Sequence, residues 1–363
     1  RAALLRHRVA AHQLGTAAVA LRECGVLGAG VRDNPMGVTA SVSLRARGID
    51  ADEADAELVC AYSIRSALHV HRRDDLSRLR AALRWSVGDE PAEQTYGAVV
   101  SGDGQDVQET VDHVVRAMRD AMSDATPRTK GELSTAVTGR VVPGDAPWCP
   151  SCEVQHVNDA LFRYATLFAG LVAVAGQGRS FRLHPIDEGS AEPAPDTARS
   201  ELLRRYLHLA GAATPAQLAT WVGVSRPAAK RWWSLLDDEL TPVRVDGTRM
   251  WSLSADLESL SASAHDHDAI HLLPAYDPYT EIADRKQLVP ASEQRRKVWR
   301  AVRNPGVVLR AGEIAGIWRD RRDGSGRSVT IEPFEPLTAK QRRTAADATE
   351  TLLHPTPVNL TFA

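Results

Sequence analysis

The chain has 363 residues, enough for two to four domains that each bury a hydrophobic core. Hydrophobic residues make up 43% of it and charged residues 25%, the usual balance of a soluble globular protein. No run of about 18 apolar residues occurs, so we expect neither a membrane span nor a signal peptide. Four cysteines do not suggest a disulfide framework, and we therefore expect a reducing, cytoplasmic location.

The net charge of −2 conceals an uneven distribution of charge. Residues 1–47 hold seven Lys/Arg and two Asp/Glu (net +5), and residues 285–327 hold twelve and four (net +8). Because these segments together carry +13, the remaining residues carry −15. Such polarisation suits a protein that binds a phosphate backbone. Two solvated basic faces balanced by acidic loops explain the charge equally well.

Residues 1–85 are predicted to form a first winged-helix-like unit. Gly28–Pro35 is too rich in glycine for a helix, so we expect a loop there. Apolar periodicity places the helices of this unit at residues 4–14, 15–24, 38–47, 52–61 and 74–83.

Two histidines share one face of a strand predicted at residues 66–71. We expect His69 and His71 to face outward, because Leu68 and Val70 occupy the opposite face. Two neighbouring imidazoles on a surface can contact DNA phosphate. A satisfied structural pair is, however, the more common situation for such histidines.

Residues 106–185 are predicted to form a second winged-helix unit, which follows a loop at residues 86–105. A capping box at Thr129–Glu132 marks the start of one of its helices. The other elements expected are helices at residues 107–122 and 151–171 and hairpin strands at residues 172–175 and 180–183.

Three side chains within the second unit have the spacing of metal ligands. Cys149 and Cys152 are separated by two residues, and His156 follows one helical turn later. A fourth ligand is not evident nearby, although Asp145 or His184 could fold back. The set predicts either a structural zinc site or two reduced thiols.

Residues 199–253 give the most specific pattern of the sequence, that of a helix-turn-helix followed by a wing. Thr214–Gln217 supplies a capping oxygen, a proline at the first helical position and an amide three residues on. Ser225 caps a second helix at residues 226–238. Two short strands then meet at Asp246-Gly247, a strong hairpin pattern. Together these features predict a third winged-helix unit.

The second helix of this unit has one basic and one aromatic face. Arg226, Lys230 and Arg231 are expected to point outward, as on a recognition helix that enters the major groove of DNA. Trp232 and Trp233 are expected to pack inside the protein rather than stack on bases.

Residues 265–363 are predicted to form a C-terminal β-rich module. The fold class is therefore mainly α with small β-wings (α+β), comprising three tandem winged-helix units and this module. Its expected elements are helices at residues 291–302 and 338–353 and strands at residues 307–310, 314–319 and 328–332.

A hairpin tip in this module carries three cations. Gly324-Ser325-Gly326 forms the turn, and Arg321, Arg322 and Arg327 flank it. We expect this tip to probe a groove of DNA.

Four stretches, together with the three winged-helix units, resemble one family: Arg65–His69, Leu272–Tyr279, Asn304–Val308 and Gly316–Arg319. It is the AlkZ-like family of tandem winged-helix DNA glycosylases, and the resemblance covers nearly the whole chain. It implies a C-shaped protein that clasps damaged or alkylated double-stranded DNA and excises alkylated purines or unhooks interstrand crosslinks. It also implies a monomer that requires no cofactor and no membrane.

The chain departs from this family at the catalytic motif. Family enzymes carry Gln-x-Gln, or Gln-x-Asp in a sister branch, where this chain reads Arg32-Asp33-Asn34. In one register Arg32 and Asn34 occupy the two Gln positions. In the other, Asp33 occupies the second position, as in the sister branch. The sequence leaves both registers open.

Hydrolysis of an N-glycosidic bond requires an aimed water molecule and a polar or negative group near the developing oxocarbenium ion. Asp33 is our candidate for the base or the cation stabiliser, Asn34 for positioning the water, and Arg32 for a phosphate contact. Alternatively, Asp33-Asn34-Pro35 is an Asx-type turn before a helix.

The sequence thus predicts a DNA-binding protein that is a monofunctional glycosylase for alkylated or bulky purine adducts. The loop Gly28–Pro35 contains no lysine, so we expect no Schiff-base lyase chemistry there. The competing hypothesis is a non-catalytic winged-helix DNA-binding protein or regulator that has lost the glycosylase motif.

Overall fold

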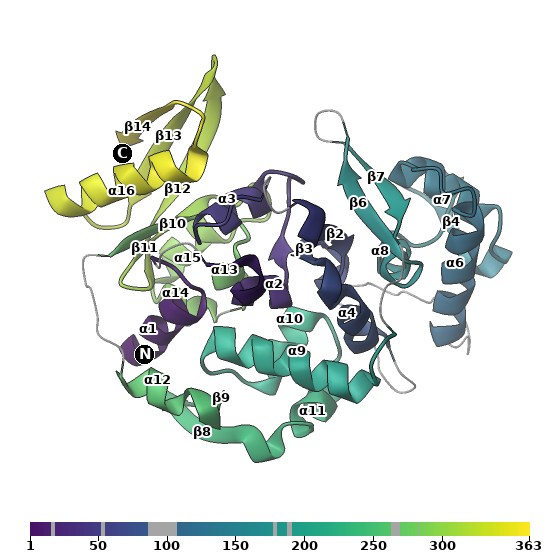
Figure 1. The fold of residues 1–363 in the computed structure, drawn as a ribbon, viewed down its shortest axis with the longest axis horizontal. Coiled ribbons are helices and arrows are strands. Elements are labelled where there is room, and N and C mark those ends of the chain that lie inside the picture. The colour runs from purple at the N-terminus through teal and green to yellow at the C-terminus, as the bar shows by residue number, and fades with distance from the viewer. Residues whose placement is uncertain are drawn as a thin grey trace. The chain divides into compact units, whose positions relative to one another are not determined.

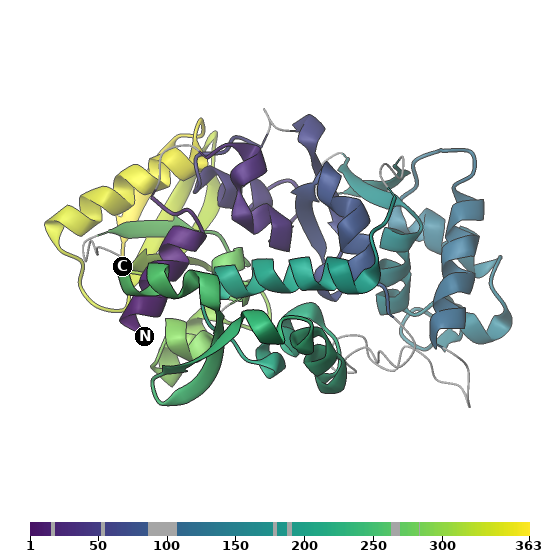
Figure 2. The same ribbon diagram turned by 60° about the horizontal axis from the view of Figure 1, so that its bottom comes forward.

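A computed structural model describes residues 1–15, 19–51, 55–85, 107–176, 180–186, 191–262, 269–282 and 284–363 (Figure 1). The chain divides into two compact units. Unit 1 comprises Arg1–Asp55, Arg204–Thr214 and Asp238–Ala363, and unit 2 comprises Ala56–Leu203 and Pro215–Asp237. The helix α9 (Pro195–Ala210), the long teal helix in Figure 2, begins in unit 2 and ends in unit 1.

A five-stranded sheet forms the centre of unit 1. Its strand order is β10-β11-β12-β13-β14, antiparallel throughout except for the parallel pair β13–β14. The strands are β10 (Ile270–Leu273), β11 (Gly306–Arg310), β12 (Glu313–Asp323), β13 (Gly326–Pro333) and β14 (Val358–Phe362).

Each face of this sheet buries its own hydrophobic core, because successive side chains of a strand point to opposite faces. Val307 packs with residues of α1, α13, α14 and α15, whereas Val308 packs with residues of α3 and α16. These helices are α1 (Ala2–Ala11), α3 (Thr39–Arg45), α13 (Pro278–Ile282), α14 (Arg285–Leu288), α15 (Ser292–Val298) and α16 (Ala339–Leu353).

Unit 1 also contains a small wing. Strands β8 (Leu240–Val245) and β9 (Thr248–Leu253) pair across Asp246 and Gly247, which both have positive φ angles. Met250 of the wing packs against Leu4 of α1. The helix α12 (Leu257–Ala262) follows the wing.

Unit 2 contains a second sheet, in which β3, β2, β6 and β7 lie in that order and pair antiparallel. The strands are β2 (Leu58–Tyr62), β3 (Leu68–Arg72), β6 (Leu171–Ala175) and β7 (Phe181–Pro185). The helices are α4 (Leu76–Leu83), α6 (Val107–Ala121), α7 (Lys130–Thr138), α8 (Asp159–Phe168), α10 (Pro215–Val222) and α11 (Arg226–Ser234).

The local sequence patterns predicted many of these elements. The capping box at Thr129 starts α7, and the hydroxyl of Ser225 accepts the backbone N–H of Ala228 at the start of α11. The expected class, helical with small sheets, is confirmed. The division into winged-helix units and their C-shaped arrangement stay predictions. None of the described helices combines the length and apolar character of a membrane span.

Two predicted helices are wrong, and a third begins later than expected. Residues 19–24 of the predicted helix 15–24 hold only a 3₁₀ turn, and the helix is instead α2 (Gly25–Ala29). Residues 58–61 belong to β2, because they pair with β3 and β6. The helix predicted from residue 151 begins only at Asp159, after Asn158 accepts its first backbone N–H groups.

Two more predicted helices are shorter than expected: the one at residues 226–238 ends at Ser234, and the one at residues 291–302 ends at Val298. The loop predicted at residues 86–105 lies outside the described residues.

Candidate functional site

The Arg32 loop, residues 30–38 of unit 1, contains the candidate catalytic residues. α2 ends at Gly30, whose φ of 92° lies in the left-handed region that glycine tolerates. The chain then forms the two-residue strand β1 (Val31–Arg32) and reaches α3 at Thr39. The loop predicted to begin at Gly28 therefore starts two residues later.

Asp33 is buried and its two carboxylate oxygens hold the loop together. Oδ2 accepts the N–H of Gly37 at 2.6 Å, and Oδ1 accepts the N–H of Ala40 at 3.0 Å. Burial raises the pKa of Asp33, while these backbone hydrogen bonds oppose the rise. These bonds reach four and seven residues along the chain, whereas an Asx turn joins residues two apart and Pro35 has no N–H to donate, so the loop is held by wider bonds than the turn interpretation predicted. Asn34, by contrast, is exposed at the surface of the loop.

Arg32 lies against two residues that the sequence did not indicate. Its guanidinium carbon is 4.3 Å from the centre of the Tyr276 ring, and its Nη1 is 3.4 Å from Oε2 of Glu281. Nε of Arg32 is buried and makes no hydrogen bond within the described part of the chain. Tyr276 belongs to a stretch singled out for family resemblance, but no local pattern marked Glu281.

A buried ion pair stabilises the segments next to the Arg32 loop. Nη1 and Nη2 of Arg47 lie 2.9 and 3.0 Å from the two carboxylate oxygens of Asp277, and both side chains are fully buried. The hydroxyl of Ser43 donates to Oδ2 of Asp277 at 2.6 Å, and the N–H of Tyr279 donates to Oδ1 at 2.9 Å. These bonds join α3 to the segment that carries Tyr276.

The hydrogen bonds and the ion pair with Arg47 favour the ionised form of Asp277. Burial alone raises the pKa of Asp277, but the positive charge of Arg47 and the hydrogen bonds outweigh it, so the pKa lies below its usual value. The carboxylate of Asp277 is therefore charged at neutral pH. The two partners of the ion pair are far apart in the sequence, and neither was predicted.

The hairpin β12–β13 presents two of the three cations that the sequence placed at its tip. Arg321 and Arg322 are exposed on β12, and the turn contains Gly324 with a φ of 58°. Arg327, opposite Arg322 in the register, is half-buried and forms an ion pair with Asp320. Two of the three arginines thus face solvent.

The orientation predicted for the histidines of β3 is wrong. His69 and His71 are 5% and 0% exposed, and it is this face of the strand that is covered. The Ser63 hydroxyl lies 2.9 Å from Nε2 of His71, and Nδ1 of His69 donates to the carbonyl of Ala67 at 2.9 Å. These bonds compensate for part of the cost of burying the two rings. Their role as DNA contacts remains untested.

The basic face of α11 in unit 2 matches the prediction. Arg226, Lys230 and Arg231 are exposed, whereas Trp232 and Trp233 are buried. The three cations therefore form an exposed surface, and its role as a recognition helix stays a prediction.

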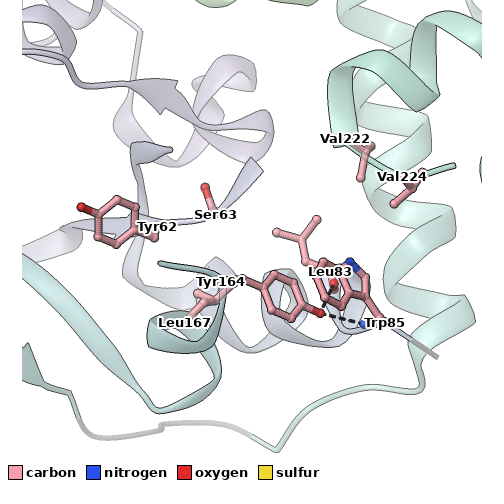
Figure 3. A pocket seen from close by; sticks show the side chains of 8 residues that line it. All are labelled: Tyr62, Ser63, Leu83, Trp85, Tyr164, Leu167, Val222 and Val224. Atoms are coloured by element: carbon pink, nitrogen blue, oxygen red, sulfur yellow. Dashed lines mark hydrogen bonds between the residues drawn. The ribbon is translucent and has the colours of Figure 1, made fainter. Parts of the chain in front are cut away.

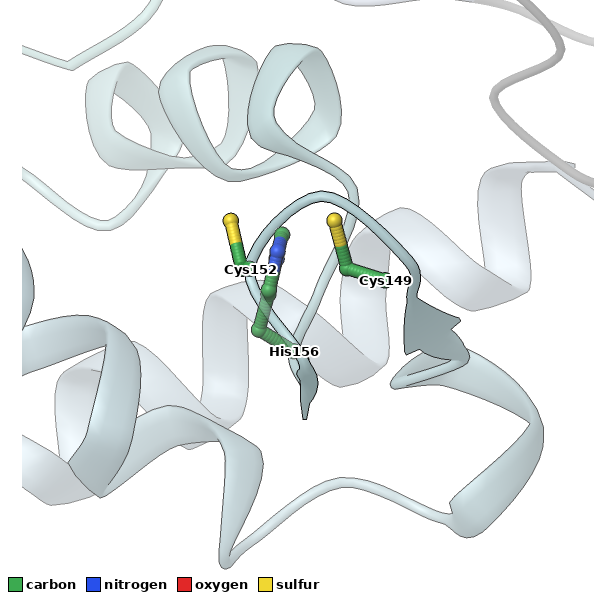
Figure 4. A group of neighbouring side chains, drawn as sticks. All are labelled: Cys149, Cys152 and His156. Atoms are coloured by element: carbon green, nitrogen blue, oxygen red, sulfur yellow. The ribbon is translucent and has the colours of Figure 1, made fainter.

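The three predicted metal ligands of unit 2 lie together (Figure 4). Hydrogen bonds from the Ser151 hydroxyl and the Cys152 backbone, with a smaller contribution from His156, lower the pKa of the Cys149 thiol to about 6. The carbonyl of Val157 raises the pKa of His156.

A small hollow in unit 2 is not a substrate site. Trp85 stacks on Tyr164 with 3.8 Å between ring centres, and the Tyr164 hydroxyl joins the carbonyl of Leu83 to the N–H of Trp85 (Figure 3). The space beside them, also lined by Tyr62 and Ser63, is about 10 Å³. That volume holds at most about one water molecule and excludes a nucleobase.

One protein family accounts for most of the chain. The chain belongs to the AlkZ-like DNA glycosylase family, because the family model described as DNA glycosylase AlkZ-like matches residues 29–354. The resemblance inferred from the sequence is thereby confirmed.

A relative and a solved structure, both from Streptomyces sahachiroi, are similar to this chain. An interstrand DNA cross-link repair glycosylase is 33% identical over 132 residues, and the match spans 35% of this chain and 35% of that relative's length. The solved structure of DNA glycosylase AlkZ superposes with a TM-score of 0.75 at 20% identity over 99% of both chains. The two chains thus share one fold.

Proposed function

We propose that this protein is a monofunctional DNA glycosylase that hydrolyses the N-glycosidic bond of alkylated or bulky purine adducts in duplex DNA. The family match carries the proposal, because it begins at residue 29 and includes the whole Arg32 loop. The name of the cross-link repair relative supports interstrand crosslinks as further substrates.

The geometry supports a division of roles within the loop. Asn34 is exposed and can orient a water molecule toward the anomeric carbon. Both carboxylate oxygens of Asp33 accept backbone N–H groups. Because these bonds occupy its lone pairs, Asp33 is better suited to stabilise positive charge than to accept a proton. Glu281 provides a second carboxylate beside Arg32. An alkylated purine already carries positive charge, so these groups suffice and we propose no cofactor for the reaction.

Arg32 has the chemistry of a phosphate contact. Its side chain is 25% exposed, and its Nη1 contact with Glu281 is long at 3.4 Å. A DNA phosphate would provide a charge-assisted acceptor for this guanidinium. Further phosphate contacts would come from the exposed cations of the hairpin and of α11: Arg321, Arg322, Arg226, Lys230 and Arg231.

An excision assay tests the proposal. A duplex with one 7-methylguanine is incubated with the protein, and released base is measured beside DNA binding. We expect release by the wild type and a loss of about 100-fold or more in Asn34→Ala with binding retained, since positioned polar groups contribute about 10²–10⁴-fold. Asn359→Ala, which changes an exposed asparagine on β14, serves as the control.

The competing function is a non-catalytic DNA-binding protein. The observation in its favour is that Asp33 is fully engaged in holding the loop. Salt-sensitive binding without base release from any alkylated duplex would overturn the glycosylase proposal and support this alternative.

A further inference from the structure

A short hairpin in unit 2 brings two thiols and an imidazole to one place. Strands β4 (Trp148–Cys149) and β5 (Val154–Gln155) pair, and the N–H of Glu153 closes the turn on the carbonyl of Cys149 at 2.8 Å. Cys152 lies within this turn and His156 directly follows β5. The three side chains gather on one side of it (Figure 4).

The imidazole of His156 is prepared to act as a metal ligand. Nδ1 lies 2.7 Å from the carbonyl of Val157, which can only accept, so the proton is on Nδ1. The neutral ring therefore presents the lone pair of Nε2. That atom is buried and makes no hydrogen bond within the described residues. Metal-bound histidines almost always donate their other ring N–H in this manner.

The distances within the group fit a single ion. The sulfur atoms of Cys149 and Cys152 and the nitrogen of His156 all lie within 4.8 Å of one another. Ligand atoms around a tetrahedral zinc lie roughly 3.5–4 Å apart, as Zn–S and Zn–N bonds of about 2.3 and 2.0 Å require. To reach these separations, the three ligand atoms need to move by about 1 Å or less, which rotation of the side chains allows.

We propose that Cys149, Cys152 and His156 bind a zinc ion. Thiolate and imidazole together favour Zn²⁺ over the oxygen-seeking Mg²⁺ and Ca²⁺. Within the described ranges, no fourth His, Cys, Asp or Glu joins the group, so water completes the tetrahedron. Asp145, a possible fourth ligand by sequence, instead pairs with His113.

The ion would provide rigidity that the hairpin does not obtain from packing. Each of its strands has two residues, and the side chains of Trp148 and Val154 are 60% and 51% exposed. A segment with so little buried surface gains order from a metal instead of a core. The proposed role is therefore structural and independent of the glycosylase reaction.

A second cluster of possible metal ligands differs from the Cys149 cluster in its hydrogen bonds. His7, His208 and Asp256 of unit 1 also lie within 4.8 Å of one another. Both nitrogens of His7 are already hydrogen-bonded, to the hydroxyl of Ser259 and to the carbonyl of His208. His7 has no lone pair to offer, and we propose no metal there.

Metal analysis of the full-length protein, purified under reducing conditions, tests the proposal. We expect about one zinc ion per chain, and cobalt substitution should give the thiolate charge-transfer and tetrahedral d–d bands. Cys152→Ser and His156→Ala should each weaken zinc at least about 100-fold in a chelator competition, because even second-shell changes cost about 10–100-fold. Cys60→Ala, which removes a buried cysteine of β2, should bind zinc like the wild type.

Three results would overturn the zinc site. One is a folded wild-type protein without zinc that gains no cobalt bands when the ion is added. Another is zinc binding that Cys152→Ser, His156→Ala and Cys60→Ala leave equally unchanged. A Cys149–Cys152 disulfide that persists in reductant, seen by mass spectrometry, would also exclude the site.

Discussion

The Arg47–Asp277 ion pair allows a quantitative test of how the Arg32 loop is supported. Replacing Asp277 with Asn preserves the shape of the side chain and removes its charge. The amide oxygen can still accept the N–H of Tyr279. The amide nitrogen, however, then faces Nη1 of Arg47, and two hydrogen-bond donors cannot bond to each other. The fully buried guanidinium loses its counter-charge.

The expected loss of stability is large. Removing one partner of a buried ion pair costs about 3–5 kcal/mol, because the remaining charge stays buried and uncompensated. For a unit of this size, about 1 kcal/mol lowers the melting temperature by roughly 2–4 °C, so Asp277→Asn should lower it by roughly 6–20 °C. Ser43→Ala removes only the hydroxyl that donates to Asp277 and should cost about 1.5–3 kcal/mol.

Thermal melting combined with hydrogen–deuterium exchange measures both effects. Peptides from residues 39–47 and 270–282 should lose protection in Asp277→Asn, while peptides from the unit 2 sheet serve as an internal control. The double change Arg47→Met with Asp277→Leu should recover most of the stability, because it leaves no buried charge. A loss below about 1 kcal/mol in Asp277→Asn, or a double variant as unstable as the summed single changes, would refute this account of the pair.

Two further predictions concern other parts of the fold. The hydrogen bond to Asp256 raises the pKa of His208, so this pair contributes stability that is complete below the unfolded pKa of about 6.5 and is lost as the pH rises through the folded value. The slope should be shallow because His208 is half-exposed, and melting curves of Asp256→Asn should show no such slope. In unit 2, Tyr164→Phe leaves the N–H of Trp85 and the carbonyl of Leu83 without their shared partner. It should cost about 1–3 kcal/mol in urea unfolding, and an unchanged midpoint would contradict that role.

Features encoded by neighbouring residues were predictable from the sequence. The caps at Thr129 and Ser225 and the hairpin turn at Asp246-Gly247 depend on side chains within a few positions, and the structure contains all three. The strand β2 was mistaken for a helix because its identity depends on pairing with β3 and β6. Local periodicity does not contain that information.

The same distinction applies to the candidate site. Alternation along β3 correctly grouped His69 with His71, but it could not show which face of the strand would be covered. The proximity of Cys149, Cys152 and His156 follows from short spacing and was predicted. The contacts of Arg32 with Tyr276 and Glu281 span more than 240 positions, and only the folded chain brings them together.

The path of the chain between the two units affects how the protein can be made and divided. The chain passes from one unit to the other after Asp55, Leu203, Thr214 and Asp237. During synthesis, unit 2 is fully translated once Asp237 has been added, whereas unit 1 must wait for β14 at the very end of its sheet. Its opening helices therefore emerge from the ribosome long before the strands that cover them. A single cut anywhere in the sequence severs at least one unit, so neither can be isolated by simple truncation.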